Sequence, residues 1–477
     1  MFVNPTQIFP MRRKLAKSQP RASHYRYTIL TATVRHRRIR SNRTASVSEG
    51  GKLTIRNDLI QEGAPLKTFR RLGFLASAAA LLAACGSSST SAPSSSTTGV
   101  SSSATTAAAK SPYVIHAIVS ETGSASFLGS REAKSLQALA VEVNATGGID
   151  GHPVQMDIQD NQSNPSTSVS YATKLISSGV PFILNGSVVA VDSAVDALAT
   201  PNGPFIYDLS PGVHPKAGSM VFSAGLSTGF MAQAYLTYLK SQGLTKIAAI
   251  TSTDGSGKDG FDQLQATLKE PQFSSFQLLS HQTFDPSAVS VTTQLSVIKA
   301  AHPQALVIWT TGTPLGVVLN GMSSLGMNDI PTFTTDGNSV HSELVHFSSI
   351  LPKKFYIPNA PLYLPPSDIS NPQVRAQVTT FDKAIAQVGG HPSVAWGLSW
   401  DPAQLLIGAI KKLGVDATAT QIQNYMQHLS NVPGIFGMYN SSVTDHRGLA
   451  ASDETVTLWN GNSFTPVSGP AGVPLKG

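Results

Sequence analysis

The sequence predicts an α/β fold in which parallel sheets are covered by helices on both faces. From residue 113 onward, short apolar segments alternate with amphipathic ones, as in chains built from βαβ units. Segments such as 305–309 (Ala-Leu-Val-Ile-Trp) lack polar alternation, which indicates strands buried on both faces. The chain has 477 residues, of which 41% are hydrophobic, and this is enough for two to three domains with substantial cores.

Each predicted strand is followed by a predicted helix. In the first helix, Ala133, Leu136, Ala140 and Val143 recur on one face, as an amphipathic helix requires. Strands are expected at 113–120, 154–159, 181–185, 205–209, 246–251, 275–283 and 305–310. Helices are expected at 131–144, 167–178, 191–199, 230–242, 260–269, 289–301 and 315–325, and a further helix ends at Leu413.

The net charge of +7 is concentrated at the N-terminus. Residues 1–84 hold 16 of the 34 basic residues but only 3 of the 27 acidic ones. The remaining chain therefore has 18 basic and 24 acidic residues and is mildly acidic. A folded part of this composition offers no basic stripe for phosphates, so no nucleic-acid partner is expected.

The single cysteine, Cys85, follows a secretion signal. Lys67, Arg70 and Arg71 precede an apolar run of 13 residues that ends in small residues, which is the pattern of a signal peptide. The run is shorter than the roughly 20 residues that a membrane-spanning helix needs. The tetrapeptide 82–85 (Leu-Ala-Ala-Cys) resembles the bacterial lipobox, which implies that Cys85 carries a lipid and becomes the first residue of the mature protein.

Three N-terminal segments are predicted before the globular part. Residues 1–60 are interpreted as a non-native or mis-called leader, because signal peptides begin near their positive segment. Residues 61–84 form the lipoprotein signal peptide, and residues 85–110 form the lipidated cysteine and a tether rich in Ser, Thr and Ala. A flexible coil from 86 to 109 spans about 27 Å, so it would hold a globular body outside the membrane to which Cys85 is anchored.

One segment is specific enough to suggest a family. Asn144, Gly147, Gly148, Ile149 and Gly151 form an N-x-x-GG-I-x-G pattern at the end of a predicted helix, just before a strand. The glycines suit a helix end and a tight turn, which need positive φ angles. This pattern, with the order of elements over residues 112–462, resembles the leucine/isoleucine/valine-binding protein family.

The resemblance implies a type I periplasmic-binding fold with two α/β lobes and a ligand cleft between them. Lobe I is then expected at 111–224 plus 361–435, and lobe II at 225–360 plus 436–470. Three crossover segments are expected near 222–226, 358–362 and 435–438.

The resemblance also implies ligand contacts at the ends of several strands. Asp336 matches the acidic residue that pairs with an amino-acid ammonium group, although a turn-capping role is an equal alternative. Ser187 and Ser210 match loops that hold a ligand carboxylate, with capping as the alternative role; valines follow Ser187, which puts carboxylate recognition in question. The expected ligand-binding residues are Phe127, Ser187, Val188, Ser210, Ser256, Thr313 and Asp336.

Residues 255–260 form a G-x-G-x-x-G sequence between a predicted strand and a predicted helix. This is the context of a dinucleotide-binding loop. Against that interpretation, the strand lies inside the array, and Asp285 is 25 residues beyond Gly260 instead of the usual ~20. The sequence also has no H-E-x-x-H or G-x-S-x-G motif.

The resulting functional prediction is a receptor for a small amino-acid-like or amide-like solute, held outside the cell membrane by lipidated Cys85. Its expected partners are the solute, the permease subunits of an ABC importer and the membrane. No catalytic residue, metal or cofactor is expected. A ligand sensor of the same fold that feeds a signalling partner is the alternative, and a dinucleotide-binding enzyme is a third reading.

Overall fold

The computed structural model describes residues 43–47, 53–57 and 110–475, and the chain divides into two compact units. In the smaller unit, β1 (Arg43–Val47) and β2 (Leu53–Asn57) pair antiparallel. The predicted signal peptide and Cys85, with the predicted tether up to residue 109, lie outside the described residues. Within the described ranges, no helix is long and apolar enough to cross a membrane.

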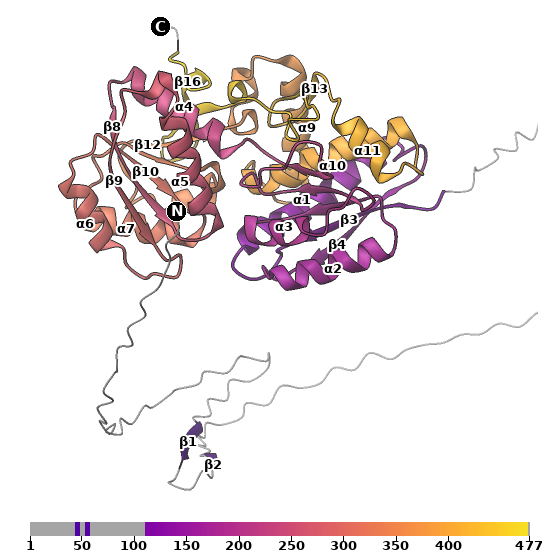
Figure 1. Cartoon of the computed structure of the whole chain (residues 1–477), viewed down its shortest axis with the longest axis horizontal. Coiled ribbons are helices and arrows are strands. Elements are labelled where there is room, and N and C mark those ends of the chain that lie inside the picture. The colour runs from indigo at the N-terminus through magenta and orange to yellow at the C-terminus, as the bar shows by residue number, and fades with distance from the viewer. Residues whose placement is uncertain (1–42, 48–52, 58–109, 476–477) are drawn as a thin grey trace, which may run out of the picture. The chain divides into compact units, whose positions relative to one another are not determined.

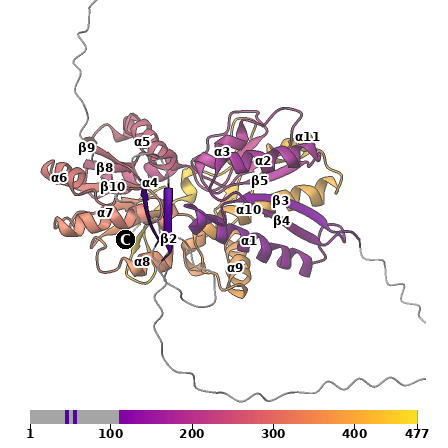
Figure 2. The same cartoon turned by 90° about the horizontal axis from the view of Figure 1, so that it is seen from below.

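The larger unit contains two helix-covered sheets that lie side by side, and each is the centre of one lobe (Figures 1 and 2). The sheet of the first lobe has five parallel strands in the order β4-β3-β5-β6-β7. These are β3 (Tyr113–Val119), β4 (Val154–Asp160), β5 (Phe182–Asn185), β6 (Phe205–Asp208) and β7 (Val221–Ser223). Its helices are α1 (Ser126–Ala145), α2 (Pro165–Ser177), α3 (Val189–Asp196), α9 (Pro372–Gln387), α10 (Val394–Leu413) and α11 (Ala419–Met426).

The sheet of the second lobe has seven strands in the order β16-β15-β12-β11-β10-β8-β9. They are β8 (Lys246–Ser252), β9 (Gln277–Phe284), β10 (Ala305–Trp309), β11 (Thr332–Thr334), β12 (Phe355–Asn359), β15 (Thr455–Trp459) and β16 (Phe464–Pro470). The helices are α4 (Thr228–Ser241), α5 (Gly255–Leu268), α6 (Thr292–Ala300), α7 (Thr313–Ser324) and α8 (His341–His346). The predicted parallel α/β fold is confirmed, but β15 and β16 add an antiparallel edge.

Helices cover both faces of each sheet. In the second lobe, one core cluster joins the strands to α4 and α5, and a separate cluster joins them to α6, α7 and α8. In the first lobe, α1 and α10 pack together although they are far apart in the sequence, because Ser135 Oγ donates to Trp396 O at 2.7 Å and Ser399 Oγ donates to Glu132 O at 3.0 Å. Figure 1 shows the orange C-terminal helices beside the purple α1.

The glycine pair after α1 forms the turn that the sequence predicts. Gly147 and Gly148 have φ angles of 97° and 71°. Asn144, at the start of the pattern, joins the helix end to β4, because its Oδ1 accepts from Val154 N at 2.6 Å and its Nδ2 donates to Val154 O at 2.9 Å. The pattern that suggested the family therefore positions a strand, and its residues do not line the pocket between the lobes.

The third crossover falls later than the predicted 435–438. Ile435, Phe436, Tyr439 and Leu449 belong to the main core cluster of the first lobe. Asp401 of α10 holds this segment by accepting hydrogen bonds from the backbone N–H groups of residues 435 and 436 and from the hydroxyl of residue 439, all within 3.1 Å. The chain returns to the second sheet only between 449 and 454.

Candidate functional site

A pocket lies between the lobes at the ends of their strands. Its empty space of about 520 Å³ includes the part that opens to solvent. Its lining comes from both lobes and is mostly apolar, with several hydroxyl groups and two carboxyl groups. The lining residues are Leu128, Ser187, Val188, Val189, Ser210, Pro211, Gly212, Val394 and Leu398 from the first lobe, and Thr228, Ser256, Asp259, Trp309, Thr311, Thr335, Asp336 and Gly337 from the second.

The hydroxyl of Ser187 is already engaged within the first lobe. It donates to Glu132 Oε2 and accepts from Ser120 N at 3.1 Å. Glu132 is fully buried, and burial raises the pKa of its carboxyl to about 8, although the hydrogen bond from Ser187 opposes this shift. Ser187 therefore orients its loop against a buried carboxyl instead of presenting a free donor to the pocket.

The next two residues of this loop begin α3. Val188 is the N-cap residue and supplies no side-chain cap, and both Val188 and Val189 line the pocket. The first N–H groups of a helix have no partner inside the helix, so those of α3 can bind a carboxylate or carbonyl oxygen of a ligand. The backbone can thus replace the hydroxyl groups that the valines lack.

Ser210 is fixed through its backbone. Its N–H donates to Asp192 Oδ2 at 2.9 Å, and its carbonyl accepts from Ser223 Oγ at 2.9 Å. Burial raises the pKa of Asp192 well above its ordinary value, while the hydrogen bond from Ser210 lowers it. The side chains of Asp192 and Ser223 therefore hold the loop that carries Ser210 at the edge of the pocket.

Asp336 lies in the short 3-10 helix Asp336–Asn338 after β11, and only 2% of it is exposed. Burial raises the pKa of its carboxyl to about 7, although hydrogen bonds from Thr335 Oγ1 and Gly337 N and the charge of Arg447 lower it. Among the described residues that line the pocket there is no Lys, Arg or His. A cationic ligand group would compensate the buried charge of Asp336.

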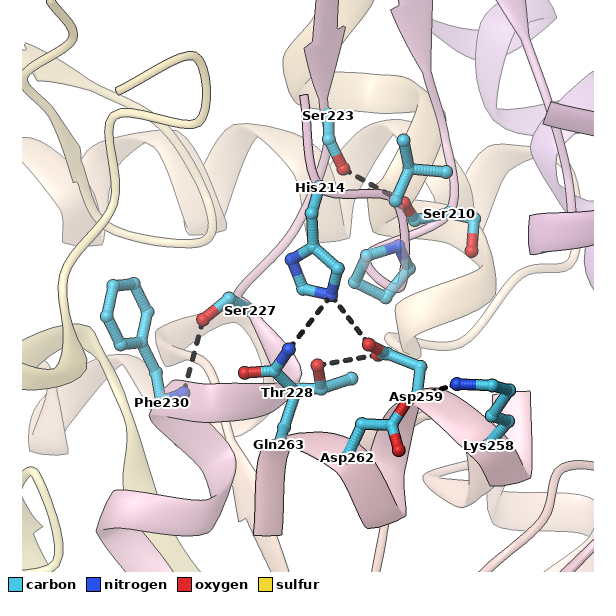
Figure 3. A network of polar contacts seen from close by, with 12 residues as sticks. Ser210, His214, Ser223, Ser227, Thr228, Phe230, Lys258, Asp259, Asp262 and Gln263 are labelled. Carbon is cyan, nitrogen blue, oxygen red and sulfur yellow. Dashed lines mark hydrogen bonds and ion pairs between the residues drawn. The ribbon is translucent and has the colours of Figure 1, made fainter. Parts of the chain in front are cut away.

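Asp259 of α5 is the second carboxyl of the pocket, and its partners occupy both of its oxygens (Figure 3). Thr228 Oγ1 donates to Oδ2 at 2.7 Å, and His214 Nε2 lies 2.6 Å from Oδ1. His214 belongs to the loop after β6 in the first lobe, so this contact crosses between the lobes. The sequence alone did not predict a role for Asp259 in the pocket.

Five of the seven expected ligand contacts line the pocket, namely Ser187, Val188, Ser210, Ser256 and Asp336. Phe127 does not line it; its ring faces the second lobe, where a Cβ on Gly312 would lie 3.0 Å from Phe127 Cε1. Thr313 is exposed at the start of α7, and Thr311, two residues earlier, lines the pocket in its place. These placements do not test ligand contact, so the roles stay predictions.

The glycines of 255–260 have a packing role. The helix begins at Gly255, so the pattern lies inside the first turns of α5 and not in a loop. A Cβ on Gly257 would lie 2.0 Å from Ser252 O, and one on Gly260 would lie 2.2 Å from Trp309 Cγ. The N-cap is Asp254, whose carboxylate accepts from Gly257 N at 2.9 Å. A carboxylate at this helix end disfavours the phosphate group that a dinucleotide would place there.

A family model described as periplasmic binding protein matches residues 112–458, which is most of the chain. The chain belongs to this family. Over 91 residues it is 32% identical to the Leu/Ile/Val-binding protein homolog 1 of Brucella abortus (strain 2308), a match that covers 19% of this chain and 24% of that protein. The predicted resemblance to the leucine/isoleucine/valine-binding family is confirmed.

Solved structures share the fold. An extracellular ligand-binding receptor from Rhodopseudomonas palustris HaA2 superimposes with a TM-score of 0.67 at 20% identity, covering 75% of this chain and 100% of that one. A branched-chain amino acid transporter substrate binding protein from Streptococcus pneumoniae, solved with isoleucine, gives 0.60 at 19% identity over 74% and 97% of the two chains. An ABC transporter solute binding protein from R. palustris, solved with benzoate, gives 0.61 at 18% identity over 76% and 97%.

Proposed function

We propose that this protein is the extracytoplasmic solute-binding receptor of an ABC importer, which captures a small amino-acid-like or amide-like solute between its lobes. The observation that carries the proposal is the pocket that both lobes line, with the buried carboxyl of Asp336 inside it. A ligand that contacts both lobes favours their closed arrangement, and this closure is the signal that a permease can recognise.

The composition of the pocket favours a solute with an amine or amide donor and an apolar body. Asp336 supplies the acceptor, and the N-terminus of α3 supplies N–H donors for a carboxylate or carbonyl group. Val188, Leu398 and Trp309 supply apolar contacts. Isoleucine, found in the Streptococcus pneumoniae structure, has both an ammonium and a carboxylate group. Benzoate, found in the R. palustris structure, has no cation to compensate Asp336.

The proposed location outside the cell rests on the family and on the signal and lipobox pattern that precedes Cys85. A lipid on Cys85 would keep the receptor next to its permease. A ligand sensor of the same fold is the second candidate, because a closing receptor can signal to a regulator equally well. Genes for a permease and an ATPase beside this one would favour the importer.

Thermal unfolding of the purified protein against a panel of compounds tests the proposal. The panel contains amino acids, their amides, urea compounds, benzoate and NAD. A ligand present at 100 times its dissociation constant adds about 2.7 kcal/mol to the free energy of unfolding, which raises the melting temperature measurably. We expect amino acids or amides to stabilise the protein, and NAD to have no effect.

Asp336→Asn should weaken binding of an amine-bearing solute by at least about tenfold, because the ammonium group loses a charged partner in a buried site. The matched control is Asp329→Asn, since Asp329 lies on the same lobe and forms an exposed pair with Lys353. Isothermal titration calorimetry of both variants gives the comparison. Equal affinity in the two variants would contradict the role of Asp336, and stabilisation by NAD alone would contradict the receptor.

A further inference from the structure

His214 and Asp259 form an ion pair that joins the two lobes beside the pocket (Figure 3). His214 Nε2 lies 2.6 Å from Asp259 Oδ1. Gln263 Nε2, one turn further along α5, lies 3.4 Å from the same histidine nitrogen. The imidazole of the first lobe therefore rests on one face of a helix of the second.

Both members of the pair are held in position from their own lobes. Thr228 Oγ1, at the start of α4, donates to the other oxygen of Asp259 at 2.7 Å. The loop of His214 is fixed by the buried Arg447, which donates to Pro211 O at 2.9 Å and to Val213 O at 2.7 Å. The side chain of Asp259 is 11% exposed and that of His214 is 44% exposed, so the pair is partly shielded from water.

No other ion pair in the described part of the chain connects the lobes. His116–Asp157 lies within the first lobe, and Lys258–Asp262 and Lys353–Asp329 lie within the second. The contacts of His214 with Asp259 and Gln263 join polar side chains of the two lobes. Across the cleft, the ring of Phe127 also faces Gly312, and His341 lies near His391.

We propose that His214 and Asp259 form a latch that holds the lobes together. The two side chains belong to different lobes, so opening of the cleft separates them. The latch stands whether or not the solute proposed above is correct, because it concerns the movement of the lobes.

Several other charged groups surround the latch. On α5, Lys258 and Asp262 form an exposed pair of opposite charges. Lys216 lies on the loop of His214, and Arg447 lies behind that loop with its guanidinium bonded to carbonyl groups. Elsewhere at the cleft, His341 of the second lobe and His391 of the first have ring centroids 6.4 Å apart. The variants below leave this second pair unchanged, so they isolate the latch.

The distance between two spin labels measures closure directly. Labels on cysteines introduced at Thr173 of α2 and Thr293 of α6, both exposed, report on the two lobes in the full chain carrying Cys85→Ser. Pulsed electron spin resonance without added solute gives the ratio of closed to open molecules.

Asp259→Asn should lower the closed-to-open ratio about threefold, as expected for one partly exposed pair. His214→Lys should keep the ratio high, because the lysine ammonium group can pair with Asp259. The matched control is Asp262→Asn on the same helix, which should behave like the parent protein. The latch is refuted if Asp259→Asn and Asp262→Asn give the same distances, or if His214→Lys lowers the ratio as much as Asp259→Asn does.

Discussion

Replacing Glu132 with glutamine should stabilise the protein, and the gain should grow as the pH rises. Glu132 is fully buried on α1 beneath the pocket. Ser187 donates to its Oε2, while Oε1 has no hydrogen-bond partner among the described residues. Glutamine can accept the same hydrogen bond. Its amide group would lack a partner, but so does the hydroxyl of the protonated glutamic acid, so this cost cancels in the comparison.

The magnitude follows from the pKa of the carboxyl, which is 4.5 in its ordinary state and about 8 in the folded protein. Below pH 4.5 the group is protonated in both states and does not affect stability. Above that value the unfolded chain releases the proton while the folded chain retains it, so folding becomes less favourable as the pH rises to 8. The buried carboxyl of Glu132 thus lowers the free energy of unfolding by about 1 kcal/mol at pH 5 and by about 3 kcal/mol at pH 7.

Urea unfolding of the parent protein and of Glu132→Gln at pH 5 and pH 7 measures this difference. The increase in the free energy of unfolding that Glu132→Gln produces should be about 2 kcal/mol larger at pH 7 than at pH 5. Glu142→Gln is the control, because Glu142 lies on the same helix and is only partly buried. A gain that is equal at the two pH values would show that Glu132 is ionised in the folded protein, and would refute the reasoning.

Two further substitutions, each compared with a second one, test how the lobes are packed and joined. Gly260→Ala should lower the free energy of unfolding by about 1–3 kcal/mol, because its Cβ would lie 2.2 Å from Trp309 Cγ. Gly408→Ala in α10, where a Cβ would meet nothing within 4 Å, should raise it by about 0.5–1 kcal/mol. Thermal unfolding measures both. Arg447→Met should lower the free energy of unfolding, measured with urea, by more than about 3 kcal/mol. The reason is that the buried guanidinium donates to four carbonyl groups of residues 211–225. Arg375→Met, which removes an exposed arginine bound to a single carbonyl, should cost less than about 1 kcal/mol, and equal losses in the two arginine variants would contradict the argument.

The order of strands and helices could be predicted because each buried strand is a continuous apolar run. The starts of two helices could not. Gly129 and Gly257 lie in stretches whose composition indicates loops, yet they are in the first turns of α1 and α5. A Cβ on Gly129 would lie 2.3 Å from the Ser120 backbone, and one on Gly257 would lie 2.0 Å from Ser252 O. Each glycine lets a helix pack on the end of the preceding strand, and only the folded chain reveals that contact.

The site could be predicted only at the ends of strands, where parallel strands direct their loops to one edge. Asp336 and Ser210 follow strands directly and were found in this way. Other hydrogen-bonded pairs at the pocket join distant positions: His214 and Asp259 are 45 residues apart, and Glu132 and Ser187 are 55 apart. Nothing in the local composition marks such pairs, because their proximity results from the packing of helices.

The antiparallel edge of the second sheet has a consequence for biosynthesis. β12 pairs with β15, and Thr457 Oγ1 donates to Ile357 O across a separation of 100 residues. Until the last strands have emerged, β12 presents unpaired backbone groups that can pair with another chain. A polypeptide terminated before residue 455 would therefore be prone to aggregation even though every residue of the pocket had already been made. Strands β15 and β16 therefore protect a sheet edge that would otherwise be open to other chains.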